Sequence, residues 1–265
     1  MESQEITIKL PPITVVIPAY NEEKHLADTI RLVLESGFPC ELIVVDDGSK
    51  DKTLLIAKSF APQVRVLAQK KNRGKGSAMA WAIKEARGEI IVFLDAHLLG
   101  LKKSHFLFLV MPIVEGIADA TIGHCGTHLT SLKSALLPFW IISGQRAYRK
   151  SDLMSITQNI ESLGYGVETF LYNKFHDKQT MVIDLLGVDH LLKNDHMTAR
   201  QTATSYLKEA RDIMKTVSGI ENLNPQELAK FKNDVYAVFS QYANSGKRHA
   251  TTYAKKLAKI LQMEI

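Results

Sequence analysis

Short apolar runs alternate with amphipathic helical segments over the first hundred residues, and this alternation limits the fold more than any other feature of the chain. Four apolar, largely β-branched runs are predicted strands: 13–17, 41–45, 64–69 and 89–94. Three segments between them have apolar positions at helical spacing: 22–36, 49–60 and 76–86. Strands that alternate with helices pair in parallel through right-handed crossovers. The sequence therefore predicts an α/β fold with a Rossmann-like, mostly parallel central sheet flanked by helices.

Composition and charge narrow the class of protein further. The 265 residues are 46% hydrophobic and 23% charged, which is typical of a soluble globular chain. A net charge of +5 suits an anionic ligand or a peripheral membrane contact, but it is too small to indicate nucleic acid binding. Two cysteines without a paired motif indicate neither a disulfide framework nor a structural zinc site, so we expect a reducing, cytoplasmic location. Residues 1–12 do not resemble a signal peptide, and the apolar runs at 106–114 and 135–143 are about half the length of a spanning helix.

Polar residues follow the first two predicted strands. In open α/β sheets, ligands bind outside the carboxyl ends of the strands. Pro18, Ala19, Tyr20 and Glu22 stand in the turn after the first strand, where Tyr20 can stack on a base and Glu22 can accept from a ribose hydroxyl. The alternative is that this turn only caps the next helix.

An acidic pair, Asp46 and Asp47, ends the second predicted strand. Capping of the following helix is again the structural alternative. Two adjacent carboxylates repel each other unless donors meet them, and a base N–H or a ribose hydroxyl is such a donor. We therefore expect this pair to contact a nucleoside.

A basic loop precedes the third predicted helix. Residues 69–76 place four cations around two glycines, and Arg73, Gly74 and Lys75 form their centre. Either this is a solvated surface loop, or its cations and backbone N–H groups hold a diphosphate at the N-terminus of the helix. The loop fits neither the Walker sequence nor the dinucleotide-binding glycine pattern.

The fourth predicted strand ends in Asp95-Ala96-His97. A carboxylate and an imidazole two residues apart suit Mn²⁺ or Mg²⁺ that bridges phosphate oxygens. The pair follows the other three clusters in this order, which favours the metal-binding interpretation.

These four clusters together resemble the nucleotide-sugar glycosyltransferases of the GT-A fold, of the family-2 type, over roughly residues 14–98. The resemblance implies that the turn after the first strand and the acidic pair hold the nucleoside of a nucleotide-sugar donor. It also implies a metal on the diphosphate, held by an Asp-x-Asp motif. This chain departs from that motif because His97 stands where the second Asp is usual.

The second half is similar in order to glucosyl-3-phosphoglycerate synthases at residues 143–149, 164–168 and 184–190. This similarity implies that Gly144, Gln145 and Arg146 border the acceptor. It also implies that Glu168 lies beside the transferring sugar and that His190 completes the metal site with Asp95 and His97. Arg146 and Arg149 suit a phosphate on the acceptor. Glu168 is the candidate catalytic base if the reaction inverts configuration.

The predicted function is a metal-dependent hexosyltransferase that uses a UDP- or GDP-linked sugar and a small phosphorylated acceptor. Polyprenyl-phosphate glycosyltransferases share a similar Ser-Gly-x-Arg segment, so a lipid-linked acceptor at the inner face of the membrane stays open. A non-catalytic nucleotide-binding module is the third alternative.

Two domains are expected. A glycosyltransferase domain at 1–197 has a donor half at about 13–98 and an acceptor half at about 99–197. A basic, amphipathic helical extension follows at 198–265. That extension packs on its own domain, joins two subunits as a homodimer, or contacts a membrane surface.

Overall fold

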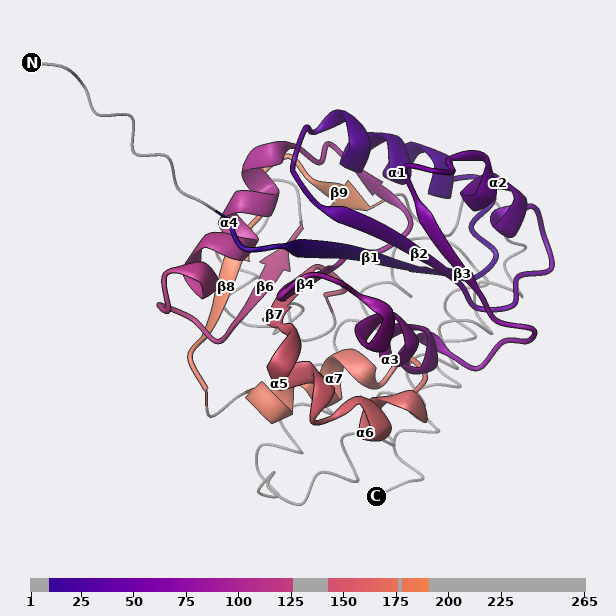
Figure 1. Ribbon diagram of the computed structural model, residues 1–265. Helices are drawn as coiled ribbons and strands as arrows, with labels where there is room; N and C mark the ends of the chain where they lie inside the picture. Colours follow the sequence, from indigo (N-terminus) through magenta and orange to yellow (C-terminus); the bar gives the residue numbers. More distant parts are fainter. Residues whose placement is uncertain (1–9, 126–142, 176–177, 191–265) are drawn as a thin grey trace, which may run out of the picture.

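The computed structural model describes residues 10–125, 143–175 and 178–190, and the predicted extension at 198–265 lies outside them (Figure 1). The described strands are β1 Ile13–Ala19, β2 Glu41–Asp46, β3 Arg65–Ala68, β4 Ile90–Phe93, β5 Leu98–Leu99, β6 Ala120–His124, β7 Arg146–Arg149, β8 Thr180–Asp184 and β9 Asp189–His190. The described helices are α1 Leu26–Glu35, α2 Thr53–Ser59, α3 Lys75–Glu85, α4 Lys103–Val114, α5 Lys150–Met154, α6 Thr157–Glu161 and α7 Val167–Phe175.

A seven-stranded sheet with the order β3-β2-β1-β4-β7-β6-β8 forms the centre of the fold. The strands β1 to β4 pair in parallel, as the alternating sequence pattern predicts. β7 runs antiparallel to both β4 and β6, while β8 is parallel to β6. The predicted α/β fold with a mostly parallel sheet is therefore confirmed, and β7 is its antiparallel exception.

The start of α1 differs from the prediction because the backbone N–H groups before it donate to side chains near α2. The first predicted helix, 22–36, begins only at Leu26. The backbone N–H of Glu22 donates to the Thr53 hydroxyl at 2.8 Å, and that of Glu23 donates to Asp51 at 3.1 Å. These two bonds tie the turn after β1 to the start of α2. Local periodicity could not reveal them because the partners are about 30 positions away in the chain.

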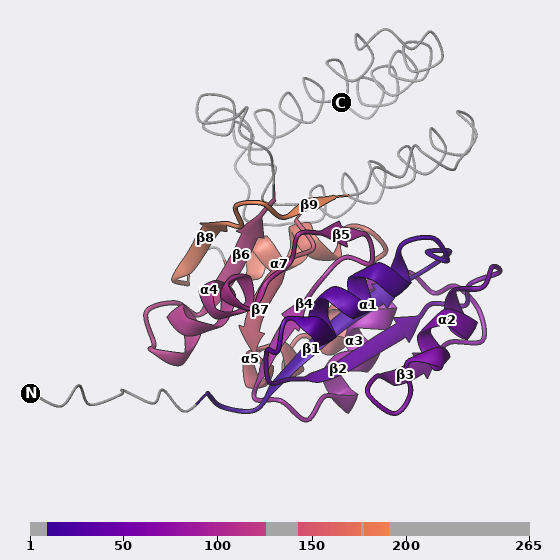
Figure 2. The ribbon, with the colours of Figure 1, turned by 90° about the horizontal axis from the view of Figure 1, so that it is seen from above.

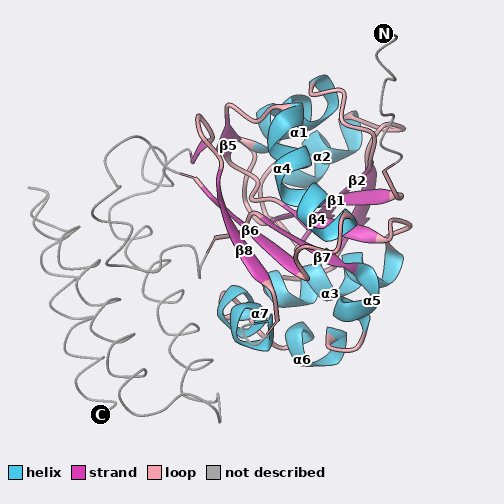
Figure 3. Ribbon diagram, turned by 90° about the vertical axis from the view of Figure 1, so that its left-hand side faces the viewer, coloured by secondary structure: helices cyan, strands magenta, loops and turns pink. Residues whose placement is uncertain are grey.

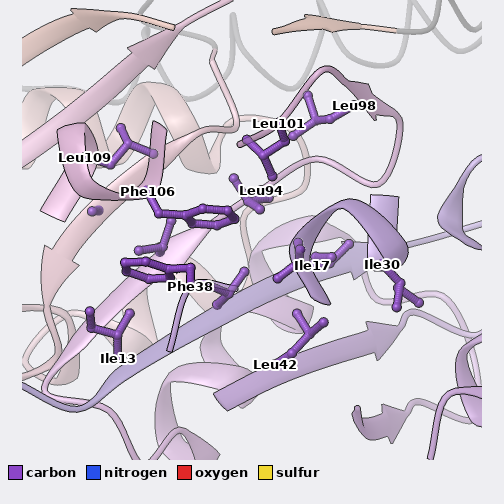
Figure 4. Close-up of a cluster of buried hydrophobic side chains, with 14 of the residues drawn as sticks. Ile13, Ile17, Ile30, Phe38, Leu42, Leu94, Leu98, Leu101, Phe106 and Leu109 are labelled. Atoms are coloured by element: carbon purple, nitrogen blue, oxygen red, sulfur yellow. The ribbon is translucent and has the colours of Figure 1, made fainter. Parts of the chain in front are cut away.

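Helices lie on both faces of the sheet (Figure 3). Between the sheet and the helices, each face carries one apolar layer. Alternate β1 side chains point to opposite faces, so Val15 packs beneath α1 and α4 while Val16 packs beneath α3. The first layer holds the stacked rings of Phe38 and Phe106, whose centroids lie 4.8 Å apart (Figure 4). The second layer lies under α3, α5, α6 and α7. Burial on both faces explains why these strands are continuous apolar runs.

A short two-stranded sheet of β5 and β9 lies apart from the main sheet (Figure 2). β5 begins directly after His97, and its Leu98 pairs with His190 of β9. The pairing brings the backbone of residue 190 next to the end of the Asp95-Ala96-His97 segment. Within the described part of the chain, no helix has the length and apolar character needed to cross a membrane.

Candidate functional site

The carboxyl ends of β1, β2 and β4 gather the predicted site at one edge of the sheet (Figure 1). Pro18 and Ala19 are the last residues of β1, and Tyr20 follows them. Ala19 pairs with Asp46, the last residue of β2. β4 ends two residues before Asp95 and pairs with β1 in parallel. Parallel pairing therefore places the groups after the first, second and fourth strands side by side.

The acidic pair divides into two carboxylates with different partners. Asp47 accepts hydrogen bonds from the backbone N–H groups of Arg73 and Gly74, each at 2.8 Å. Asp46 is 1% exposed and accepts from the backbone N–H of Ser49 through one oxygen. For Asp47, the donors that offset the repulsion between the two carboxylates are therefore backbone N–H groups of the basic loop.

Two residues at the ends of β2 and β3 each have a buried acceptor atom. Among the described residues, no hydrogen-bond donor reaches Asp46 Oδ1 or Gln69 Oε1. The backbone N–H of Gln69 donates to the Asp46 carbonyl at 2.9 Å, so the two residues are neighbours. Buried acceptors without a donor are uncommon and suggest that a ligand supplies one. Gln69 was not predicted as a site residue, and its place as the first residue of the basic loop is the one feature of the sequence that could have indicated it.

The basic loop is docked on the protein through its backbone. Besides the bonds from Arg73 and Gly74 to Asp47, the N–H of Gly76 donates to the Leu163 carbonyl at 2.9 Å. The Arg73 guanidinium pairs with Glu161 at 2.9 Å and is half exposed. The expectation that backbone N–H groups of this loop face a phosphate is corrected for these three groups, because they donate inside the protein.

Lys75 extends from this loop to the end of β4. Its ammonium lies 2.8 Å from Asp95 Oδ1 and 2.5 Å from Glu168 Oε1. Burial alone would lower the pKa of Lys75, but the two carboxylates outweigh it and hold that pKa above its usual value. The lysine therefore stays charged. Two carboxylates from β4 and α7 share one cation at the strand ends.

The second oxygen of Asp95 is held by the residue that precedes β7. The side-chain amide of Gln145 donates to Asp95 Oδ2 at 2.9 Å. Gly144 lies so close that an added Cβ would overlap the Asp95 carboxylate. The segment predicted to border the acceptor thus lies against Asp95, and its Gln145 is fully buried.

Asp95, His97 and His190 are the predicted metal ligands. The imidazole Nδ1 of His97 lies 3.6 Å from the Glu22 carboxylate, which links the ends of β4 and β1. Among the described side chains, no three His, Cys, Asp or Glu residues gather as a metal site. The side chain of His190 lies outside that description. Carboxylate oxygens and imidazole nitrogens are ligand types that suit a divalent cation. The β5–β9 pairing places the backbone of residue 190 beside the end of the segment that carries Asp95 and His97.

The two predicted acceptor arginines lie in different places. Arg146 is fully buried, where its Nε donates to the Ser143 carbonyl at 2.6 Å and its Nη1 to the Tyr148 hydroxyl at 3.3 Å. Arg149 lies at the other end of β7, far from the strand-end site, and its Nη1 donates to Asp119 at 3.2 Å. The structure does not bring Arg149 to the site, and it turns the Arg146 guanidinium into the protein.

As a class, a sheet of this order with its polar groups at the carboxyl ends of β1, β2 and β4 is a GT-A domain. Residues 14–163 match the family described as Glycosyl transferase family 2, and the chain belongs to that family. The resemblance found in the sequence is confirmed.

The chain is also similar in sequence to individual glycosyltransferases. The chain is 43% identical over 98 residues to a human dolichyl-phosphate beta-glucosyltransferase, which covers 32% of this chain and 30% of the human protein. An uncharacterized glycosyltransferase of Rickettsia typhi is 26% identical over 272 residues, covering 94% of this chain and 84% of that protein. The chain thus matches less than a third of the length of its dolichyl-phosphate relatives.

A similar solved structure is glucosyl-3-phosphoglycerate synthase from Mycobacterium tuberculosis, in complex with Mn²⁺, uridine diphosphate and phosphoglyceric acid. It is 26% identical, has a TM-score of 0.59, and the match covers 80% of each chain. The likeness extends well beyond the segment shared with the human relative.

Proposed function

We propose that this chain transfers a hexose from a UDP- or GDP-linked donor to a phosphorylated acceptor, with a divalent metal on the diphosphate. The observation that carries the proposal is the charged Lys75 ammonium between Asp95 and Glu168 at the strand ends. A leaving nucleoside diphosphate gains negative charge as the glycosidic bond breaks, and a fixed cation at that position stabilises the charge.

The donor occupies the edge formed by β1, β2 and β4. Asp46 Oδ1 and Gln69 Oε1 lack donors within the described residues, and a base N–H or a ribose hydroxyl can supply them. Tyr20 and Glu22, which follow β1, border the same place. Arg73 and Gly74 act through their bonds to Asp47, which hold the loop that carries Lys75.

The metal would be held by Asp95, His97 and His190. When bound, it supplies further charge for the departing diphosphate. The residues of the chain do the remaining work: Lys75 neutralises the phosphates, and Gln145 keeps the Asp95 carboxylate in place. Glu168 lies beside the reacting centre, held by its contact with Lys75, and its carboxylate can align an acceptor hydroxyl.

The acceptor is approached from the side of residues 143–168. A small phosphorylated molecule is supported by the synthase complexed with phosphoglyceric acid. A polyprenyl phosphate is the second candidate, supported by the local identity to dolichyl-phosphate beta-glucosyltransferases. Both candidate acceptors carry a phosphate.

Transfer assays test the proposal directly. Radiolabelled UDP-glucose and GDP-mannose are incubated with Mn²⁺ and either 3-phosphoglycerate or dolichyl phosphate in vesicles. We expect sugar transfer to one acceptor and slow release of the nucleoside diphosphate without it. Neither transfer nor release from any donor would favour a non-catalytic nucleotide-binding module.

Lys75→Met tests the observation that carries the proposal, with Lys84→Met as the matched control. Both lysines belong to α3, but Lys84 is half exposed and pairs only weakly with Glu161, at 3.4 Å. We expect kcat to fall about 100-fold or more for Lys75→Met, because an electrostatic stabiliser of the departing charge is lost. Lys84→Met should retain wild-type kcat. Equal kcat values in the two variants would remove Lys75 from the mechanism.

A further inference from the structure

We propose that Gln145 is a positioning residue that orients the Asp95 carboxylate for metal binding, and that it does not bind the acceptor. The inference rests on the proposed function, since it takes Asp95 as a metal ligand. Its starting point is a side chain that is fully buried and within hydrogen-bond distance of the strand-end carboxylate.

The direction of the Gln145 amide follows from its surroundings. An ionised Asp95 can only accept, so the amide nitrogen of Gln145 must face it, at 2.9 Å from Oδ2. The amide oxygen then lies 2.9 Å from the Ser143 hydroxyl and 3.6 Å from the Cys125 thiol. Burial, with smaller contributions from Asp95 and Asp189, raises the pKa of Cys125 to about 12, so the thiol stays protonated and donates.

The bond is held by a rigid support. Gln145 follows Gly144, whose missing side chain lets the chain approach the Asp95 carboxylate. The backbone oxygen of Gln145 accepts from the Gly123 N–H of β6 at 2.7 Å, and Arg146 begins β7 in the next position. The backbone from which the amide extends is therefore fixed against β6 and the start of β7.

This arrangement fixes both oxygens of Asp95. Lys75 donates to Oδ1 and Gln145 donates to Oδ2, so the plane of the carboxylate is defined from two sides. Groups that hydrogen-bond to a ligating side chain set its orientation, and their loss typically reduces metal affinity about 10- to 100-fold. Gln145 is fully buried, and its side-chain amide donates to the carboxylate that would hold the metal.

The test compares Gln145→Met with Thr121→Val. Methionine has nearly the length of glutamine but no N–H donor, so the change removes the bond to Asp95. Thr121 is also fully buried on the neighbouring strand β6, and its hydroxyl donates to the Leu109 carbonyl at 2.7 Å. Thr121→Val thus removes a buried hydrogen bond that does not involve the site.

Binding of Mn²⁺ to each protein saturated with UDP is measured by titration calorimetry, and thermal unfolding is recorded beside it. We expect both variants to lose a few degrees of Tm. Only Gln145→Met should raise the Kd for Mn²⁺, by about 10-fold or more. Gln145→Asn keeps an amide but with a shorter reach. Its Kd for Mn²⁺ should therefore lie between those of Thr121→Val and Gln145→Met. This variant replaces Gln145→Met in the test if the methionine variant does not fold.

Three outcomes separate the inference from the proposed function. A Kd for Mn²⁺ that is equal in Gln145→Met and Thr121→Val overturns the inference. A wild type that binds UDP but no Mn²⁺ overturns it as well, together with the metal role of Asp95. A wild type that binds Mn²⁺ and UDP but transfers no sugar overturns the proposed function alone.

Discussion

Asp46 and Asp47 are adjacent in the chain, yet the structure gives them different tasks. Asp47 holds the basic loop through two backbone N–H groups, while one buried oxygen of Asp46 has no donor among the described residues. A carboxylate that completes its hydrogen bonds inside the protein acts on stability. One that lacks a donor is available to a ligand.

Asp46→Asn and Asp47→Asn should therefore separate binding from stability. We expect Asp46→Asn to raise the KM for the nucleotide sugar about 10-fold with little change in kcat, because a uniform binding contact is lost. Asp47→Asn should lower Tm by several degrees, since one amide N–H would face the N–H of Arg73 or Gly74. Steady-state kinetics and thermal unfolding of both variants check this. Equal Tm losses would contradict the division.

The substitution Gly144→Ala tests how closely the Asp95 carboxylate is packed. An added methyl group would overlap the Asp95 carboxylate, so Gly144→Ala must displace Asp95 or the start of β7. A displacement of about 1 Å at a reacting centre can cost about 100-fold in rate. We expect kcat/KM to fall by about that factor, with a crystal structure of the variant showing Asp95 moved. Wild-type kcat/KM would show that the carboxylate tolerates the shift.

At the scale of elements, Glu41 joins the amino ends of three strands, opposite the site. Its carboxylate accepts from the Thr14 hydroxyl of β1 at 2.7 Å and from the Arg87 N–H at 2.8 Å, and it pairs with Arg65 of β3 at 3.4 Å. Burial alone would raise the pKa of Glu41, but these hydrogen bonds outweigh it and the pKa lies below its usual value. The carboxylate thus stabilises the parallel half of the sheet in its ionised form.

A depressed pKa in the folded state gives stability that is present above the unfolded pKa of about 4.3 and is lost as pH falls through the folded pKa. We expect Glu41→Gln to lower the free energy of unfolding by about 1–2 kcal/mol at pH 7. The difference from wild type should shrink below about pH 4. Urea unfolding at several pH values measures it, with the exposed Glu115→Gln as control. A difference that is constant with pH would exclude the ionised carboxylate as its source.

At the scale of the whole molecule, the described residues contain a seven-stranded sheet with an apolar layer on each face. Helices of the same described ranges cover both layers (Figure 3). The predicted domain boundary near residue 197 is a proposal that truncation can test.

A chain ending at residue 197 should fold and bind UDP. We expect a single cooperative thermal transition and a Kd for UDP within about threefold of the full chain, measured by calorimetry. Sedimentation with anionic vesicles then tests the extension: binding by the full chain and not by 1–197 would assign the membrane contact to residues 198–265. Loss of UDP binding on truncation would contradict the predicted domain division.

Local patterns in the sequence determined the types of most elements and the edge at which the site lies. The four strands β1 to β4, their parallel pairing and the polar clusters after β1, β2 and β4 were all predicted. This is possible because strand and helix periodicity, and the rule for ligands at strand ends, depend on neighbours in the chain.

Only the tertiary structure decided which groups meet. Asp47 finds its donors 26 and 27 positions away, and Asp95 finds Gln145 at a distance of 50 positions. It also decided that β7 runs antiparallel between β4 and β6, which buries Arg146 and sends Arg149 to the far end of the sheet. Hydrogen-bond partners depend on how strands are ordered in space, and that order comes from packing the whole sheet, which residue spacing alone does not specify.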